Sequence, residues 1–250
     1  MISKARIKWI KSLEMRKYRL LHNAFVAEGP KLVGELLPCF APLYVAATKE
    51  WLTANKHLLV EAKEVDEVNR EELERVSLLK TPQSVLAVFP VPNTFPPREV
   101  GETGLVLALD GVQDPGNLGT ILRIADWFGI HDILCSEGTA DAYNPKCVQS
   151  CMGALARVKV HYCNLPEVLK ETNVPVFGTF LDGNNIYKEE LSRGGIIVMG
   201  NEGNGISEEV AKHINRRLYV PNYPQGSLTT ESLNVAVATG IVCAEFRRRD

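Results

Sequence analysis

The chain has 250 residues, of which 45% are hydrophobic and 23% charged, and its net charge at pH 7 is −2. With only 19 Gly and 14 Pro, this composition excludes collagen-like, low-complexity and disordered chains and is typical of a globular protein. The longest apolar runs are about five residues, against the roughly 20 that a membrane-spanning helix requires. We therefore predict no membrane span.

Six cysteines are scattered along the chain, at positions 39, 135, 147, 151, 163 and 243. Cys147 and Cys151 lie one helical turn apart, but no His or Cys pair elsewhere completes a metal site. We therefore expect no bound metal and reduced thiols, which are typical of a cytoplasmic protein. The basic start of the chain is not followed by the apolar core of a secretory signal.

Positive charge is concentrated at the start of the chain. Residues 1–31 carry eight basic and two acidic side chains, and three arginines, 247–249, lie near the end. A charge run of this kind is usually a solvated helix face, but it is also how a local phosphate-binding surface is built. The candidate residues for binding nucleic-acid phosphates are Lys4, Arg6, Lys8, Lys11, Arg16, Lys17 and Arg19.

The first predicted domain covers residues 1–95. Apolar runs at 24–27, 43–47 and 85–89 predict strands, and amphipathic patterns at 31–37 and 69–79 predict helices. Together they predict a small α/β domain. Residues 96–103 lie in a stretch rich in Pro and polar side chains, which predicts a linker.

The second predicted domain covers residues 104–250, where strands and helices alternate more regularly. Strands are predicted at 104–109, 132–135, 158–161, 176–181, 196–199 and 218–220, and helices at 117–128, 144–155 and 231–248. This alternation predicts a parallel sheet covered on both faces, with ligands beyond the carboxyl ends of its strands.

The last predicted helix has an unusual composition. Between Val235 and Ala244 it contains no charged residue and is apolar on nearly all sides. A surface helix has a polar face, so this helix is expected to be buried. It lies either deep in the domain or against a second copy of the protein.

Three loops rich in Gly and Asn, at residues 110–119, 200–207 and 221–234, each follow a predicted strand. Because Gly lets a ligand approach the backbone closely, the loops together predict a cradle for a nucleotide-like ligand. None matches the dinucleotide-binding, phosphate-loop or nucleophile-elbow motifs. The five histidines lie outside the loops, which disfavours a histidine-based hydrolase.

These loops resemble the three motifs of the SpoU/TrmH family of RNA ribose 2′-O-methyltransferases, within the SPOUT class. The matching runs are residues 109–126, 198–203 and 231–238, and the similarity extends over residues 104–247. Residues 144–146 and 150–154 also match the family. Residues 1–95 resemble, less specifically, the substrate-binding domain of the ribosomal-RNA members.

The resemblance implies an S-adenosylmethionine-dependent enzyme, a trefoil knot at the C-terminal end and a homodimer formed through the C-terminal helix region. It implies cofactor contacts from Thr179, Leu181, Gly200, Glu202, Gly203, Val220, Ser227, Leu228, Leu233 and Asn234. It implies catalytic roles for Arg123, Asn117, Glu202, Ser232 and Asn234. Residues 222–230 depart from the family, because they replace a shorter Gly-containing link.

The chemistry constrains these roles. The methyl donor is already activated, so the enzyme must orient the ribose and remove its hydroxyl proton. A guanidinium keeps its proton at neutral pH, so we expect Arg123 to grip the phosphate beside the target ribose rather than to act as a base. The proton would leave to that phosphate, to Glu202 or through water. The alternative for Glu202 is a loop carboxylate that holds backbone amides.

The sequence therefore favours a 2′-O-ribose methyltransferase acting on structured RNA. Ribosomal RNA is favoured because the simpler tRNA enzymes of the family resemble only residues 104–250. The alternatives are a tRNA 2′-O-methyltransferase, a base methyltransferase, and a non-catalytic RNA-binding module on the same fold.

Overall fold

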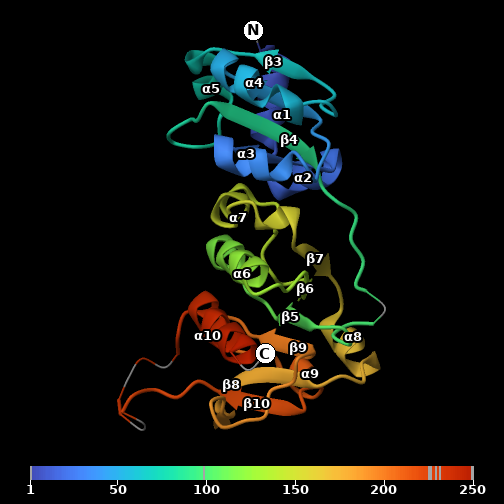
Figure 1. Cartoon of the computed structure of the whole chain (residues 1–250), viewed down its shortest axis with the longest axis vertical. Coiled ribbons are helices and arrows are strands. Elements are labelled where there is room, and N and C mark those ends of the chain that lie inside the picture. The colour runs from blue at the N-terminus through green and yellow to red at the C-terminus, as the bar shows by residue number, and fades with distance from the viewer. Residues whose placement is uncertain (1, 98, 225–226, 229, 231, 249–250) are drawn as a thin grey trace. The chain divides into compact units, whose positions relative to one another are not determined.

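The computed structural model describes residues 2–97, 99–224, 227–228, 230 and 232–248. The chain forms two compact units (Figure 1). The first unit contains residues 1–93 and 141–156, and the second contains residues 94–140 and 157–250. Among the described residues, no helix is both long and apolar enough to cross a membrane.

The first unit is built on a four-stranded mixed sheet in the order β1-β4-β2-β3. Strands β1 and β2 pair antiparallel with β4, and β2 pairs parallel with β3. The strands are β1 (Ala24–Glu28), β2 (Tyr44–Ala47), β3 (Val65–Glu67) and β4 (Val85–Pro90). The three predicted strands are confirmed within two residues. Strand β3 escaped prediction because it has three residues and none of them is buried.

Helices surround this sheet: α1 (Lys4–Ser12), α2 (Arg16–His22), α3 (Pro30–Leu36), α4 (Lys49–Asn55), the short η1 (Lys56–Leu58) and α5 (Arg70–Val76). The basic segment at the start of the chain thus forms two short helices. Helix α1 begins at Ser3, whose side chain accepts a hydrogen bond from the Arg6 amide. The fully buried side chains of Ile10 and Leu13 anchor it in the core.

Residues 141–156 lie between two strands of the second unit in sequence but pack within the first unit. They form α7 (Pro145–Ser150) and η2 (Ala154–Ala156). Gln149 Nε2 donates to the Glu28 carbonyl oxygen at 2.9 Å, and the rings of Phe25 and Tyr143 lie 5.0 Å apart. The single helix predicted at 144–155 is broken because Met152 and Gly153 both adopt positive φ angles.

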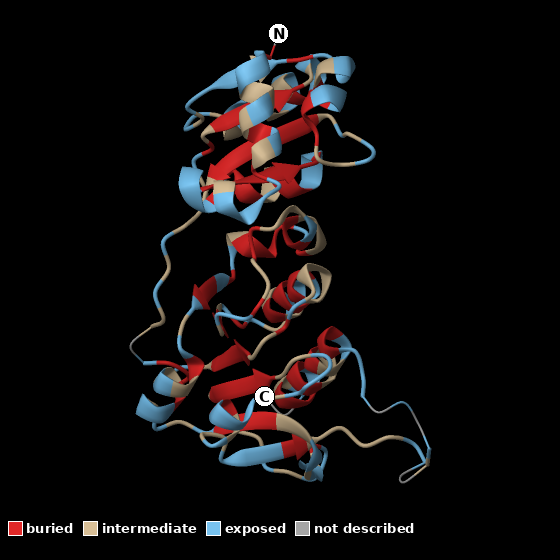
Figure 2. Ribbon diagram, turned by 180° about the vertical axis from the view of Figure 1, so that it is seen from behind, coloured by how far each residue is buried: buried red, intermediate tan, exposed pale blue. Residues whose placement is uncertain are grey.

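The second unit contains the predicted parallel sheet, with six strands in the order β10-β8-β9-β5-β6-β7. The strands are β5 (Leu105–Leu109), β6 (Asp132–Cys135), β7 (Lys159–Tyr162), β8 (Val176–Asn185), β9 (Gly195–Met199) and β10 (Arg216–Tyr219). Its helices are α6 (Pro115–Trp127), α8 (Leu165–Glu171), α9 (Glu208–Ala211) and α10 (Val235–Arg247). In both units the sheets are largely buried, and the helices expose their outer faces (Figure 2).

Helix α10 begins at Val235, because the Asn234 side chain caps it by accepting from the amides of Ala236 and Val237. The predicted start at Glu231 lies outside the described residues. One face of α10 packs against α6 and the sheet, whereas Val237 on the other face is 54% exposed. The described part of the chain therefore does not enclose this face of the helix, and the helix is not completely buried among the described residues.

Candidate active site

Three loops of the second unit start at one edge of the parallel sheet, as the sequence predicted. They follow the carboxyl ends of β5, β9 and β10. The Asp110 carboxylate, directly after β5, accepts a hydrogen bond from the Ser207 amide at 2.8 Å. The first and second loops are therefore fastened to each other at the point where they leave the sheet.

Asn201 is the main brace between these two loops, and sequence reasoning did not single it out. Its side-chain oxygen accepts from the amides of Gly203 and Asn204, and its Nδ2 donates to the Gly111 carbonyl at 2.7 Å. Its backbone pairs with Gly205 in both directions. The sequence feature that could have predicted this role is an Asn at the start of a Gly-rich turn, because Asn side chains there commonly bond the following amides.

Gly200 shows why this loop requires glycine. A Cβ added at Gly200 would lie 2.3 Å from the carbonyl carbon of Gly205, which is closer than van der Waals contact allows. At Gly203 the added Cβ would meet only the Asn201 side chain, at 3.6 Å. Gly200 therefore serves the close approach of two backbone segments, whereas Gly203 leaves open space above an exposed backbone.

A hydrogen-bond network joins all three loops through Glu202, Asn117 and Asn234. Asn117 Nδ2 donates to Glu202 Oε1 at 2.9 Å, and Asn234 Nδ2 donates to Asn117 Oδ1 at 3.0 Å. The Glu202 carboxylate also accepts from the amides of Gln113 and Asp114, at 3.3 and 3.4 Å. Three residues that the sequence predicted as catalytic are thereby brought together from distant positions in the chain.

The network changes the acidity of Glu202. Partial burial raises the pKa of its carboxyl, but the hydrogen bonds from Asn117 and from backbone amides outweigh this effect and hold the pKa below its ordinary value. The carboxylate is therefore ionised at neutral pH, and its hydrogen bonds hold the first loop in place. This geometry favours the second of the two roles predicted for Glu202.

Arg123 lies on the exposed face of α6, less than two turns after Asn117. Within the described ranges, no hydrogen bond or ion pair involves its guanidinium. Ser232 is exposed in the third loop, just before the cap of α10. The preceding motif residue, Glu231, falls in one of the gaps between the described ranges, as do Gln225 and Gly226 of the extended link.

The remaining predicted cofactor residues are distributed over the same edge of the sheet. Thr179 and Val220 are half-buried, and Leu181, Leu228 and Leu233 are exposed, Leu181 by 72%. Leu181 is therefore not a core residue of this unit. The carbonyl oxygen of Ser227 accepts from Asn222 Nδ2 at 2.9 Å. This bond braces the third loop internally.

The predicted RNA-binding residues do not all share one environment. Lys4, Lys8, Lys11, Arg16 and Lys17 are exposed on α1 and α2. Arg6 is half-buried and forms an ion pair with Glu64. Arg19 is only 3% exposed and donates to Asp141 and to the carbonyl oxygens of Leu13 and Glu14. Contrary to the prediction, Arg19 is unavailable to RNA, because its donors hold the first unit together.

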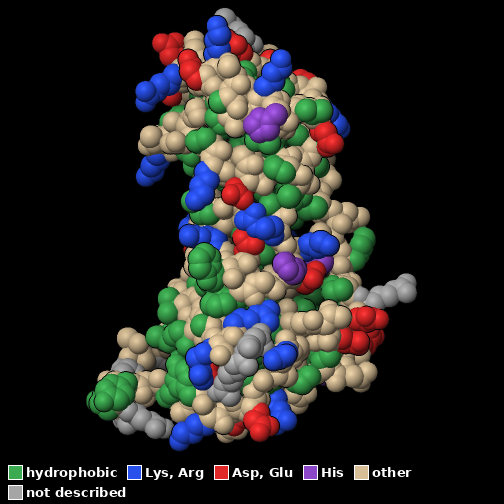
Figure 3. Space-filling model, in the orientation of Figure 1, with side chains coloured by type: hydrophobic (Ala, Val, Ile, Leu, Met, Phe, Trp, Pro, Cys, Tyr) green, Lys and Arg blue, Asp and Glu red, His purple; other side chains and the backbone are tan. Residues whose placement is uncertain are grey.

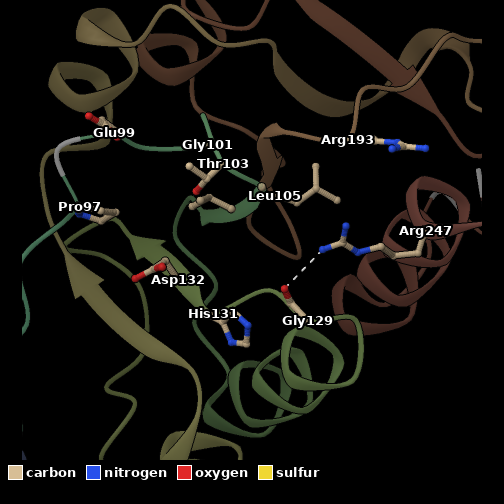
Figure 4. A pocket seen from close by; sticks show the side chains of 12 residues that line it. Pro97, Glu99, Gly101, Thr103, Leu105, Gly129, His131, Asp132, Arg193 and Arg247 are labelled. Atoms are coloured by element: carbon tan, nitrogen blue, oxygen red, sulfur yellow. Dashed lines mark hydrogen bonds between the residues drawn. The ribbon is translucent and has the colours of Figure 1, made fainter. Parts of the chain in front are cut away.

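A pocket of about 530 Å³ lies at the opposite edge of the parallel sheet (Figure 4). Its lining includes Leu105 and Asp132, which begin β5 and β6, together with Arg193 and Arg247. Arg247 Nε donates to the Phe128 carbonyl at 2.8 Å, so this member of the C-terminal arginine cluster caps α6. The pocket is separate from the three loops. Across the residues that the structure describes, no cluster of His, Cys, Asp or Glu is suited to hold a metal ion.

A parallel sheet whose Gly- and Asn-rich loops interlock at its carboxyl edge defines, with the three motifs, an RNA methyltransferase of the SPOUT class. The chain belongs to the SpoU rRNA Methylase family, whose model matches residues 104–244. Residues 4–87 match the model of the MRM3-like substrate binding domain. Both resemblances predicted from the sequence are confirmed.

Individual relatives support this assignment over the whole chain. The 23S rRNA (guanosine(2553)-2′-O)-methyltransferase RlmP of Bacillus subtilis is 34% identical, and the match covers 97% of this chain and 96% of RlmP. A solved structure from Porphyromonas gingivalis, assigned to the TrmH family of RNA methyltransferases, has a TM-score of 0.90 and 46% identity, with full coverage of both chains. An AdoMet-bound rRNA methyltransferase from Sinorhizobium meliloti has a TM-score of 0.87 and 27% identity, and covers 100% and 97% of the two chains.

Proposed function

We propose that the protein transfers a methyl group from S-adenosylmethionine to a ribose 2′-hydroxyl of ribosomal RNA. The network of Glu202, Asn117 and Asn234, which fastens the three family motifs together, is the observation that carries this proposal. The match to RlmP over nearly the whole of both chains supports ribosomal RNA of the large subunit as the substrate. The relative RlmP is bacterial, and bacteria assemble ribosomes in the cytoplasm, so we place the activity there.

The loops suit S-adenosylmethionine in two respects. Gly203 presents an exposed backbone with open space at its Cα, which lets a nucleoside approach amide and carbonyl groups. Leu181, Leu228 and Leu233 offer exposed apolar side chains at the same edge of the sheet, where an adenine ring would be covered. The predicted cofactor residues are therefore retained in the proposal.

When bound, the cofactor supplies a methyl group on a sulfonium. Arg123, whose guanidinium has no partner among the described residues, provides a fork of donors for the phosphate beside the target ribose. Asn117 and Asn234 fix the loops relative to α6 and α10. Glu202 is a poor proton acceptor, because its pKa is lowered and its oxygens already accept three hydrogen bonds. The hydroxyl proton therefore leaves to the RNA phosphate or to water.

Calorimetric titration with S-adenosylmethionine and with its demethylated product tests the cofactor site. We expect micromolar binding that Gly203→Val abolishes, because the larger side chain fills the space above the loop. If the wild-type protein binds neither compound, it is a non-catalytic RNA-binding module on this fold.

Turnover of Arg123→Lys tests the phosphate clamp. Lysine keeps the charge but loses the bidentate fork, so we expect a large loss of methyl transfer with cofactor affinity unchanged. Near-wild-type turnover would exclude the clamp.

Analysis of the methylated RNA separates the remaining alternatives. A 2′-O-methyl group blocks alkaline cleavage at its nucleotide, whereas a base methyl group usually does not. Parallel reactions with ribosomal RNA and with tRNA then identify the substrate class. Methylation of tRNA alone would contradict the proposed substrate.

We also infer a homodimer through the α10 region. Val237 on α10 and Trp127 at the end of α6 are 54% and 85% exposed, and these two helices pack together. A second copy would cover such apolar side chains. Sedimentation of Val237→Glu, expected to be monomeric beside a dimeric wild type, tests this inference. The trefoil knot remains a prediction from the family resemblance.

A further inference from the structure

A row of three aromatic rings lies on α1 and α2 of the first unit. The ring of His22 stacks near that of Tyr18, with centroids 6.3 Å apart and planes inclined by 16°. The Trp9 ring meets His22 edge-on at 6.4 Å. These spacings are within the usual range for aromatic pairs, and the three rings belong to one cluster.

A cation stands at each end of this row. The Arg6 guanidinium lies 5.3 Å from the centre of the Trp9 ring, and Lys17 Nζ lies 4.8 Å from the centre of the Tyr18 ring. Both distances permit a cation–π interaction. Arg6 also lies 4.6 Å from the centre of the Tyr44 ring and pairs with Glu64, so Lys17 is the end cation available to a phosphate. We call the row of Arg6, Trp9, His22, Tyr18 and Lys17 the aromatic row.

The aromatic row is accessible from solvent. Its central ring, His22, is exposed, and the rings of Trp9 and Tyr18 are half-buried. The neighbouring side chains of Lys8 and Lys11 on α1 are also exposed. Basic side chains stand out from the surface of this unit (Figure 3).

Rings and cations in one row suit a particular kind of nucleic acid. Paired bases are already stacked inside a duplex, so a duplex offers mainly its phosphates to such a surface. Unpaired bases present their flat faces, which stack on aromatic rings while cations contact the phosphates between them. The base selectivity of such stacking is low, because every base has a flat face.

We propose that the aromatic row binds unpaired nucleotides of the RNA substrate, with a base stacked on His22. This inference rests on the proposed function and adds to it a binding site and the form of RNA that occupies the site. It predicts that the first unit contributes to substrate binding by holding a loop or bulge of the RNA.

Fluorescence anisotropy on the full chain tests the inference with three labelled probes. These are a short oligouridine, an oligomer of equal length that lacks the bases, and an RNA duplex. We expect the wild type to bind oligouridine more tightly than the abasic oligomer. His22→Ala is expected to weaken oligouridine binding about tenfold, with little change for the abasic oligomer.

Matched variants separate stacking from other effects. His22→Phe keeps a ring and is expected to restore oligouridine binding, whereas Tyr18→Leu keeps apolar bulk but no ring and is expected to weaken it. His57→Ala removes another exposed histidine of the same unit, outside the row, and is expected to bind as the wild type. Titration with S-adenosylmethionine is expected to give the same affinity for all four variants.

Several results would overturn the inference. Equal affinity of the wild type for oligouridine and the abasic oligomer would leave only phosphate contacts. Leu20 and Leu21 on α2 are each 71% exposed, so a protein partner is the rival occupant. Unchanged RNA binding by His22→Ala, with altered self-association in sedimentation, would assign the row to a second copy. In either case cofactor binding would still report separately on the proposed function.

Discussion

Replacing Asn117 by Asp tests whether the bond between the first and second loops organises the site. The two side chains have the same shape, and an Asp at this position still accepts from Asn234 Nδ2. The contact with Glu202 changes most, from an amide donor 2.9 Å from Oε1 to a second negatively charged oxygen. The variant therefore tests mainly this electrostatic interaction.

The magnitude follows from this distance. Two unit charges 2.9 Å apart repel by about 1.4 kcal/mol at the dielectric constant of water. An acidic residue in the first turn of α6 gains roughly 0.5 kcal/mol from the helix dipole, which opposes this loss. Asn117→Asp also loses the hydrogen bond to Glu202, worth about 1 kcal/mol, so it should be less stable than the wild type by about 2 kcal/mol. That corresponds to a melting temperature about 4–8 °C lower.

The effect of the substitution on stability depends on pH. In the wild type the pKa of Glu202 is lowered, so its stabilising effect is present above the ordinary value of 4.5 and is lost as the pH falls through the lowered pKa. In the Asp variant the paired carboxylates raise the pKa of one of them. The loss of stability relative to the wild type should therefore shrink as the pH falls towards about 5. Scanning calorimetry of the full chain measures the wild type and Asn117→Asp at each pH. Equal melting temperatures at neutral pH would refute the reasoning.

Three further predictions concern other parts of the chain. Gly200→Ala should abolish cofactor binding in calorimetric titration, because its Cβ would clash with the loop backbone, whereas Gly104→Ala, whose Cβ meets nothing within 4 Å, should bind normally. Asp141→Asn should destabilise the first unit by about 2 kcal/mol in thermal unfolding, because buried Arg19 loses its counter-ion; an unchanged transition would contradict this. Ribosomal RNA affinity should fall steeply with salt, and Lys11→Ala should reduce the slope of log K against log salt by about 0.9, so an unchanged slope would remove Lys11 from the interface.

The sequence determined the class of fold and the family because both are encoded in local patterns. Continuous apolar strands alternating with helices predicted the parallel sheet. Each of the three motifs lies within a short run of residues, so the residue types and the order of the motifs could be identified without a structure. Asn117, Glu202 and Asn234 were singled out in this way, because each belongs to one of those runs.

Only the tertiary structure decided which of these residues form hydrogen bonds with one another. Glu202 and Asn117 are 85 residues apart, and Asn117 and Asn234 are 117 apart, so no local pattern predicts their hydrogen bonds. The burial of Arg19 also depended on a distant residue, Asp141, which supplies its counter-ion. Charge in a sequence shows which side chains attract anions, but burial and partners are set by contacts between distant segments. These contacts decided which cations are available to RNA and which hold the fold together.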